Sequence, residues 1–354
     1  MTEFSKEFTT WLENHAEELD QNSGTLADSL LERIAKEEVF KIGVPKELGG
    51  SGGNQSAVIE ALTELGKQSL TAAFISWGHR TFIENILASS NPYPRTVWLS
   101  ELITGQRAAG TGLSNAVKFL SAIEELNVTV IEKGDNYYLQ GRLPWVTNLR
   151  SDRFVAVFAA GFENSSQKPI IVAVPSETDG LKRSEDLEFV ALQGSNTAAL
   201  TFDRVPLDKR WILSYDAQDF LAQTRPAFLG FQFGMGLGLT ERALIEVEQS
   251  LDKGRSVLTK DYTDALDRLR RLKSTLYSGL DKEHYFVEHP KKLFQLRIDI
   301  VDLASTSLLL ELQSGGGQSY FRHSSSSFIR RWNEGAFLPI VSPSAVQLRH
   351  ILAH

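Results

Sequence analysis

The sequence predicts a multidomain α+β protein in which a helical segment, a β-rich segment and a second helical segment follow one another. Helical periodicity dominates the first 109 residues, short β-rich runs fill residues 110–215, and helical patterns return from residue 216 to the end. A chain of 354 residues is long enough for two or three structural units. We therefore expect domains at 1–109, 110–215 and 216–354.

The first third carries apolar side chains at helical spacing. Gly43 and Pro45 are expected to end the second helix, and Pro94 to open a later one that holds Trp98 and Leu102. The core face of the first helix is expected to contain Phe4, Phe8, Trp11, Leu12 and Leu19. That of the second is expected to contain Leu26, Leu30, Ile34 and Val39. That of the third is expected to contain Ala57, Val58, Ala61, Leu62 and Leu65.

The middle third is rich in β-branched and aromatic residues and is expected to form a β domain. Residues 133–136 combine Lys, Gly, Asp and Asn, which is typical of a tight hairpin turn. The expected strands are 128–131, 137–139, 154–158, 170–174 and 199–202.

Four long helical patterns fill the last third, at 229–251, 262–280, 293–312 and 327–337. Gly234, Gly236 and Gly238 lie inside the first pattern without a preceding strand, so close helix packing explains them better than a dinucleotide-binding loop. The glycines at 49–53 lack the Lys-Ser/Thr pair of a phosphate-binding loop and are read as a connection. The serines at 324–327 are expected to form a loop that leads to a helix cap.

Composition excludes several function classes. A net charge of −7 provides no basic surface for nucleic acid, and no apolar run approaches the length needed to cross a membrane. The N-terminus has no signal-peptide core, so we expect a cytoplasmic protein. The chain has no cysteine, which removes disulfides and thiolate chemistry. His350 and His354 lack a third ligand, so no metal is expected. The sequence contains no Gly-x-Ser-x-Gly motif, so it gives no indication of a hydrolase.

Four segments, in order, carry a resemblance to a known family. Residues 40–50 resemble the loop that acyl-CoA dehydrogenases carry after their opening helices. Residues 138–148 resemble the family's strand pair that ends in a Trp-Ile-Thr-Asn type segment, and residues 200–207 resemble the end of its β domain. Residues 312–317 resemble its Gln-x-x-Gly-Gly segment, and together the four span nearly the whole chain.

The resemblance implies an N-terminal helical domain, a middle antiparallel β domain and a C-terminal four-helix bundle. It also implies a flavin between the β domain and the bundle, FAD with FMN as the alternative, in a homodimer or homotetramer. An aromatic face can cover a flavin, and a hydroxyl can donate to its ring. By resemblance, Trp145 and Thr147 lie at the flavin ring, Arg255 lies at the pyrophosphate, and the adenine side is contacted across a subunit interface by Gln313, Gly315 and Gly316.

The sequence departs from the family at its flavin loop and at its catalytic base. Residues 111–116 keep only the small and polar character of that loop, where Ser114 is expected to bond to flavin. Acyl-CoA dehydrogenation needs a carboxylate that removes the α proton. Val341 occupies the position of the usual glutamate, and Thr224 that of the alternative one.

These departures leave three functions open. The first is a flavin-dependent oxidoreductase that acts on an acyl-CoA thioester. The second is a flavin-dependent monooxygenase, in which His79 would protonate or stabilise a flavin peroxide. The alternative for His79 is a hydrogen-bonded structural histidine. The third is a catalytically silent flavin-binding relative. A flavin reductase or an electron-transfer protein is the expected partner of an active enzyme.

Overall fold

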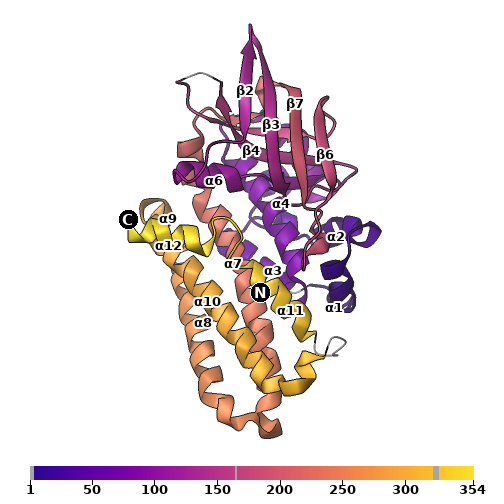
Figure 1. Ribbon diagram of the computed structural model, residues 1–354, viewed down its shortest axis with the longest axis vertical. Coiled ribbons are helices and arrows are strands. Elements are labelled where there is room, and N and C mark those ends of the chain that lie inside the picture. Colours follow the sequence, from indigo (N-terminus) through magenta and orange to yellow (C-terminus); the bar gives the residue numbers. More distant parts are fainter. Residues whose placement is uncertain (1–3, 164–165, 322–326) are drawn as a thin grey trace.

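The computed structural model describes residues 4–163, 166–321 and 327–354, and it contains the three expected parts (Figure 1). The β domain occupies one end of the molecule, and the long C-terminal helices extend to the other end. The N-terminal helices pack beside both parts. Of the serine run, residues 324–326 lie outside the described residues, and Ser327 precedes a helix without a side-chain cap bond.

Five helices form the N-terminal part: α1 (Lys6–Gln21), α2 (Thr25–Lys36), α3 (Gln55–Gln68), α4 (Leu70–Ala88) and α5 (Tyr93–Ile103). The hydroxyl of Ser69 caps α4 by accepting a bond from the Ala72 amide. Residues 40–50 form a loop with two short 3-10 turns, Val39–Lys41 and Lys46–Leu48. A Cβ atom at Gly50 would lie 2.0 Å from the carbonyl oxygen of Val44, so only glycine fits there.

The β domain holds one sheet in the order β6-β7-β3-β2-β4-β5-β8, with β1 beside β4. Its pairs are mainly antiparallel, but β1 with β4 and β2 with β4 are parallel. Lys133 pairs with Asn136 and Gly134 has a φ of 58°, which confirms the predicted hairpin turn. The strands are β1 (Ala108–Thr111), β2 (Val128–Lys133), β3 (Asn136–Val146), β4 (Phe154–Phe162), β5 (Ile170–Pro175), β6 (Leu181–Asp186), β7 (Ala198–Leu207) and β8 (Ile212–Ser214), with helix α6 (Ser114–Leu120) after β1.

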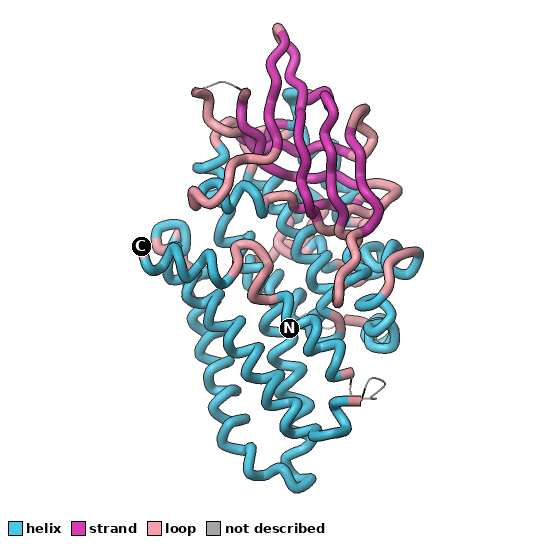
Figure 2. Tube along the Cα trace, viewed as in Figure 1, coloured by secondary structure: helices cyan, strands magenta, loops and turns pink. Residues whose placement is uncertain are grey.

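The C-terminal part is built around α7 (Ala217–Ser250), a helix of 34 residues that runs from the β domain to the far end of the molecule (Figure 2). The remaining helices are α8 (Thr259–Leu280), the short α9 (Tyr285–Glu288), α10 (Pro290–Gly315), α11 (Phe328–Phe337) and α12 (Ala345–Ala353). Helices α7, α8, α10 and α11 form the predicted bundle, and α3 packs along α7.

The glycines of α7 allow this close packing. A Cβ atom at Gly234 would lie 2.4 Å from Cβ of Leu62, and one at Gly238 would lie 2.7 Å from Cα of Gly66. Both contacts are to α3, so the prediction of close helix packing is confirmed. Among the described residues, no helix has the length and apolar character required to span a membrane.

Candidate functional site

The boundary between the β domain and the bundle brings together three of the predicted cofactor residues. Trp145 lies near the end of β3 and keeps 52% of its surface exposed, which is unusual for so large an indole. Ser114 begins α6, and both residues line a hollow of about 160 Å³ with Gly112 and Leu143. Thr147 follows β3 directly and pairs with Thr111 in an isolated bridge. Of the three residues expected at the flavin ring, Ser114 and Trp145 line the same hollow.

Thr147 has a hydroxyl that remains available as a donor. Its Oγ1 accepts a bond of 3.3 Å from the Thr197 hydroxyl, which in turn lies 2.9 Å from Oγ of Ser195. The hydroxyl proton of Thr147 bonds to none of the described residues. A ligand atom that accepts a hydrogen bond can therefore use it.

The loop between α11 and α12 reaches this boundary from the bundle side. Oγ of Ser342 lies 2.6 Å from Oγ of Ser114. The amide of Gln232, on α7, donates to the carbonyl oxygen of Ser342 at 2.8 Å. The guanidinium of Arg297, on α10, donates to the Gln232 side chain and to the carbonyl oxygen of Leu338. Three helices and a loop thus converge on Ser114.

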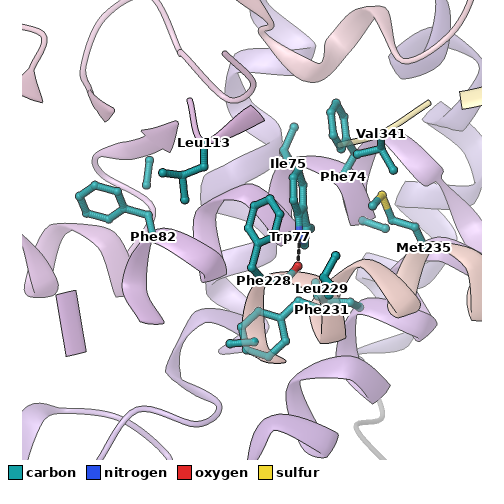
Figure 3. Packing of buried hydrophobic residues seen from close by; sticks show 14 of the residues in the cluster. Phe74, Ile75, Trp77, Phe82, Leu113, Phe228, Leu229, Phe231, Met235 and Val341 are labelled. Carbon is teal, nitrogen blue, oxygen red and sulfur yellow. Dashed lines mark hydrogen bonds between the residues drawn. The ribbon is translucent and has the colours of Figure 1, made fainter. Parts of the chain in front are cut away.

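An apolar wall lies beside this loop (Figure 3). The indole nitrogen of Trp77, on α4, donates to the carbonyl oxygen of Phe228, on α7, at 2.9 Å. Figure 3 shows Val341 next to Phe74, whose ring also packs against Phe337 at 4.6 Å between centroids. Val341, which the resemblance places at the position of the family's glutamate, is buried in this wall.

His79, the residue expected from the sequence to protonate or stabilise a flavin peroxide, has hydrogen-bond partners at both ring nitrogens. The imidazole is fully buried; Nε2 donates to the carbonyl oxygen of Leu102, and Nδ1 accepts from the amide of Ala109. Burial lowers the pKa of His79 to about 3, so the ring stays neutral. Both nitrogens join α4 to neighbouring elements, and neither is left for a substrate.

The other predicted cofactor residues form a second group at the far end of the bundle (Figure 1). Nε of Arg255 donates to the carbonyl oxygen of Ser314, and its Nη2 would lie 3.3 Å from a Cβ atom on Gly316. Gly315 precedes Gly316 at the end of α10, and the exposed Gln313 side chain bonds back to the Leu309 carbonyl. Within one chain, this group does not meet Trp145.

The residues present fit a flavin dinucleotide. Trp145 offers a half-exposed aromatic ring, over which Nζ of Lys118 lies 5.7 Å from the centroid. Thr147 offers an unused donor, and Ser114 a hydroxyl at the same boundary. No described carboxylate forms an ion pair with Arg255, so its forked donors can take a phosphate. A flavin that used both groups would need Arg255 from a second copy of the chain.

Sequence reasoning missed Gln232, Arg297 and the role of Ser342. A signal was present, because Gln232 and Arg297 stand on the apolar faces of strongly hydrophobic helices, and a buried polar residue needs a partner. Glu124 also lines the hollow, where it accepts bonds from Asn115 and Lys118. The described residues contain no group of three histidine or acidic side chains that could hold a metal ion.

Comparison with known proteins points to one family. Residues 2–106 match the family model described as acyl-CoA dehydrogenase, N-terminal domain. The Bacillus subtilis protein named Probable acyl-CoA dehydrogenase YngJ is 29% identical over 203 residues, which are 54% of this chain and 51% of the relative. CarC, a subunit of the caffeyl-CoA reductase-Etf complex of Acetobacterium woodii, is 24% identical over 58% of this chain and 53% of its own. The chain thus spans about half the length of the curated relatives it matches.

The fold extends the similarity to the whole chain. The structure of butyryl-CoA dehydrogenase from Megasphaera elsdenii superimposes with a TM-score of 0.83 over 98% of this chain and 93% of that one. The sequence identity in this superposition is 17%, so the match shows a shared fold and nothing about activity.

Proposed function

Because the chain belongs to the acyl-CoA dehydrogenase superfamily, we propose that it is a FAD-dependent oxidoreductase acting on an acyl-CoA thioester. The observation that carries the proposal is the exposed indole of Trp145, next to the unused hydroxyl proton of Thr147, where the β domain meets the bundle. A large aromatic face and a free donor at a domain boundary suit a planar cofactor.

Within this proposal, Trp145 covers the flavin ring, Thr147 and Ser114 donate to it, and Arg255 with Gly316 takes the pyrophosphate. FAD, when bound, supplies the acceptor for a hydride from the substrate. The apolar wall of Phe74 and Trp77 excludes water from the reacting carbon.

The proposed assembly is a homodimer or a higher oligomer built from it, since the two groups of cofactor residues lie at opposite ends of the bundle. Exposed apolar side chains at the Arg255 end of the bundle support the proposal, namely Val257, Leu309, Tyr320 and Phe321. The relative CarC is named as part of an Etf complex, so an electron-transfer flavoprotein is the proposed redox partner.

A second candidate is a flavin-dependent monooxygenase. The observation in its favour is that, among the described residues, no carboxylate bonds to Ser342, Gln232 or Arg297. Glu124 is already engaged by Lys118. Oxygenation by reduced flavin and O₂ needs no carboxylate that removes an α proton.

Anaerobic flavin reduction tests these proposals. The protein loaded with FAD is mixed with butyryl-CoA and longer acyl-CoA thioesters, and the visible absorbance of the flavin is followed. Bleaching supports the dehydrogenase. Absence of bleaching, together with oxygen-dependent product formation after chemical reduction, supports the monooxygenase instead. If FAD neither binds nor raises the Tm, the chain is a silent relative and both enzymatic proposals fail.

A further inference from the structure

The guanidinium of Arg297 is buried with no carboxylate beside it. It is 3% exposed, and no described acidic side chain lies within ion-pair distance. Burial lowers the pKa of Arg297 to about 10, well within the charged range at neutral pH. Removing such a charge from water is costly, and here only neutral oxygens offset the cost.

Those oxygens belong to one continuous chain of hydrogen bonds. Nε of Arg297 donates to Oε1 of Gln232 at 2.9 Å, and Nη2 donates to the carbonyl oxygen of Leu338 at 2.9 Å. Because Oε1 accepts from Arg297, the Gln232 amide nitrogen is oriented toward the carbonyl oxygen of Ser342. Arg297 thus holds the start of the 338–342 segment directly and its end through Gln232.

The end of this chain is the hydroxyl pair formed by Ser342 and Ser114. Each hydroxyl carries one proton, and the contact between them uses only one. The second proton is available to an acceptor atom in the site. Its direction depends on where the Ser342 backbone stands, and the Gln232 amide fixes that backbone.

We propose that Arg297 and Gln232 are positioning residues, which hold the 338–342 segment so that the Ser342 and Ser114 hydroxyls form one donor toward a flavin or an acyl carbonyl oxygen. The inference rests on the proposed function for its ligand, but the positioning itself is a property of the chain alone. Neither residue touches the reacting atoms.

The substitution Gln232→Glu separates positioning from simple core packing. A glutamate still accepts from Nε of Arg297 and gives the guanidinium an opposite charge, so the global Tm should be kept. It cannot donate to the Ser342 carbonyl oxygen, and its negative charge repels that oxygen. Gln218→Glu is the matched control, because Gln218 is exposed on the same helix.

Hydrogen exchange of the purified full chain gives the first readout. The amides of Val341 and Ala345 bond within the loop, to Phe337 and Pro339. We expect them to exchange roughly tenfold faster in Gln232→Glu, as for the loss of one hydrogen bond, and at the normal rate in Gln218→Glu. Equal exchange in the two variants would overturn the inference. If Gln232→Glu does not fold, Arg297→Lys replaces it, because lysine keeps the charge but has fewer donors. Faster exchange than in the control then supports the inference, and equal exchange overturns it.

FAD titration and kinetics give the second readout. Gln232→Glu and Ser342→Ala should weaken FAD binding or lower kcat at least severalfold while the Tm stays unchanged. A loosened loop with wild-type FAD affinity and kcat would refute the link between the loop and the site. A wild-type chain that takes no FAD contradicts the proposed function instead, and the exchange result distinguishes the two failures.

Discussion

Among single residues, Asp20 has an unusual environment for a carboxyl group. It is 2% exposed on α1, and one oxygen accepts a bond from the Leu192 amide. Burial, and next the nearby Glu334, raise the pKa of Asp20 to about 7, against the lowering effects of Leu192 and Arg330. The unfolded chain ionises this group near pH 4, whereas the folded protein keeps it protonated up to about pH 7.

This difference predicts a pH dependence of stability. A raised folded pKa gives a contribution that is complete below the unfolded pKa and is lost as the pH rises through the folded value. Asp20→Asn imitates the protonated carboxyl at every pH. We expect its stability relative to the wild type to increase by roughly 2–4 kcal/mol between pH 4 and pH 7, at about 1.4 kcal/mol per pKa unit. Urea unfolding at four pH values measures this, and a constant difference would contradict it.

At the scale of elements, the packing of α3 on α7 gives a prediction with an internal control. A Cβ atom at Gly238 would lie 2.5 Å from the Thr63 carbonyl oxygen, whereas one at Gly230 would meet nothing closer than 3.6 Å. Gly238→Ala should therefore cost about 1–3 kcal/mol of unfolding free energy through overpacking. Gly230→Ala should be neutral or stabilising by up to about 1 kcal/mol, because alanine favours the helix. Similar Tm values for both variants would disprove this account.

Elements with a clear periodic face were predictable, and those without one were not. The hairpin at 133–136 and the helices with one apolar stripe follow directly from their patterns. Helix α4 is buried on nearly all sides, so its sequence shows no stripe and no helix was assigned over its range. Strand β6 alternates only weakly and lies at the edge of the sheet, and it was missed for that reason.

The candidate site was predictable only where a local motif carries it. Trp145 and Thr147 belong to one short segment, which the family resemblance located. The contact of Ser114 with Ser342 joins positions 228 residues apart, and that of Gln232 with Ser342 joins positions 110 apart. Sequence spacing contains no information on such pairs. His79 shows the converse, because its chemistry suggested catalysis and only its partners reveal a structural role.

At the scale of the whole molecule, α7 sets the distance between the two groups of cofactor residues. Gln232, which bonds to Ser342 beside Ser114, lies 18 residues before the end of α7, so about 27 Å of helix separates the Trp145 group from the turn that carries Arg255. If two copies share each site, every site takes its aromatic face from one chain and its arginine from the other.

Subunit mixing tests this arrangement. Trp145→Ala and Arg255→Met should each weaken FAD binding at least tenfold in their own homodimers. When the two variants are unfolded and refolded together, a mixed dimer has one site with both defects and one intact site, so about a quarter of all sites should regain tight binding. The control refolds each variant alone. No recovery after mixing would show that each chain binds its flavin without help.

If two chains share each site, the separation of Trp145 from Arg255 also makes cofactor retention depend on protein concentration. If a flavin is held between two chains, diluting the protein below the dissociation constant of the dimer releases FAD even though no residue has changed. The fraction of the flavin that remains bound to protein would then fall on dilution, and adding apoprotein would restore it. A cell that produces little of this chain would hold it mostly without its cofactor.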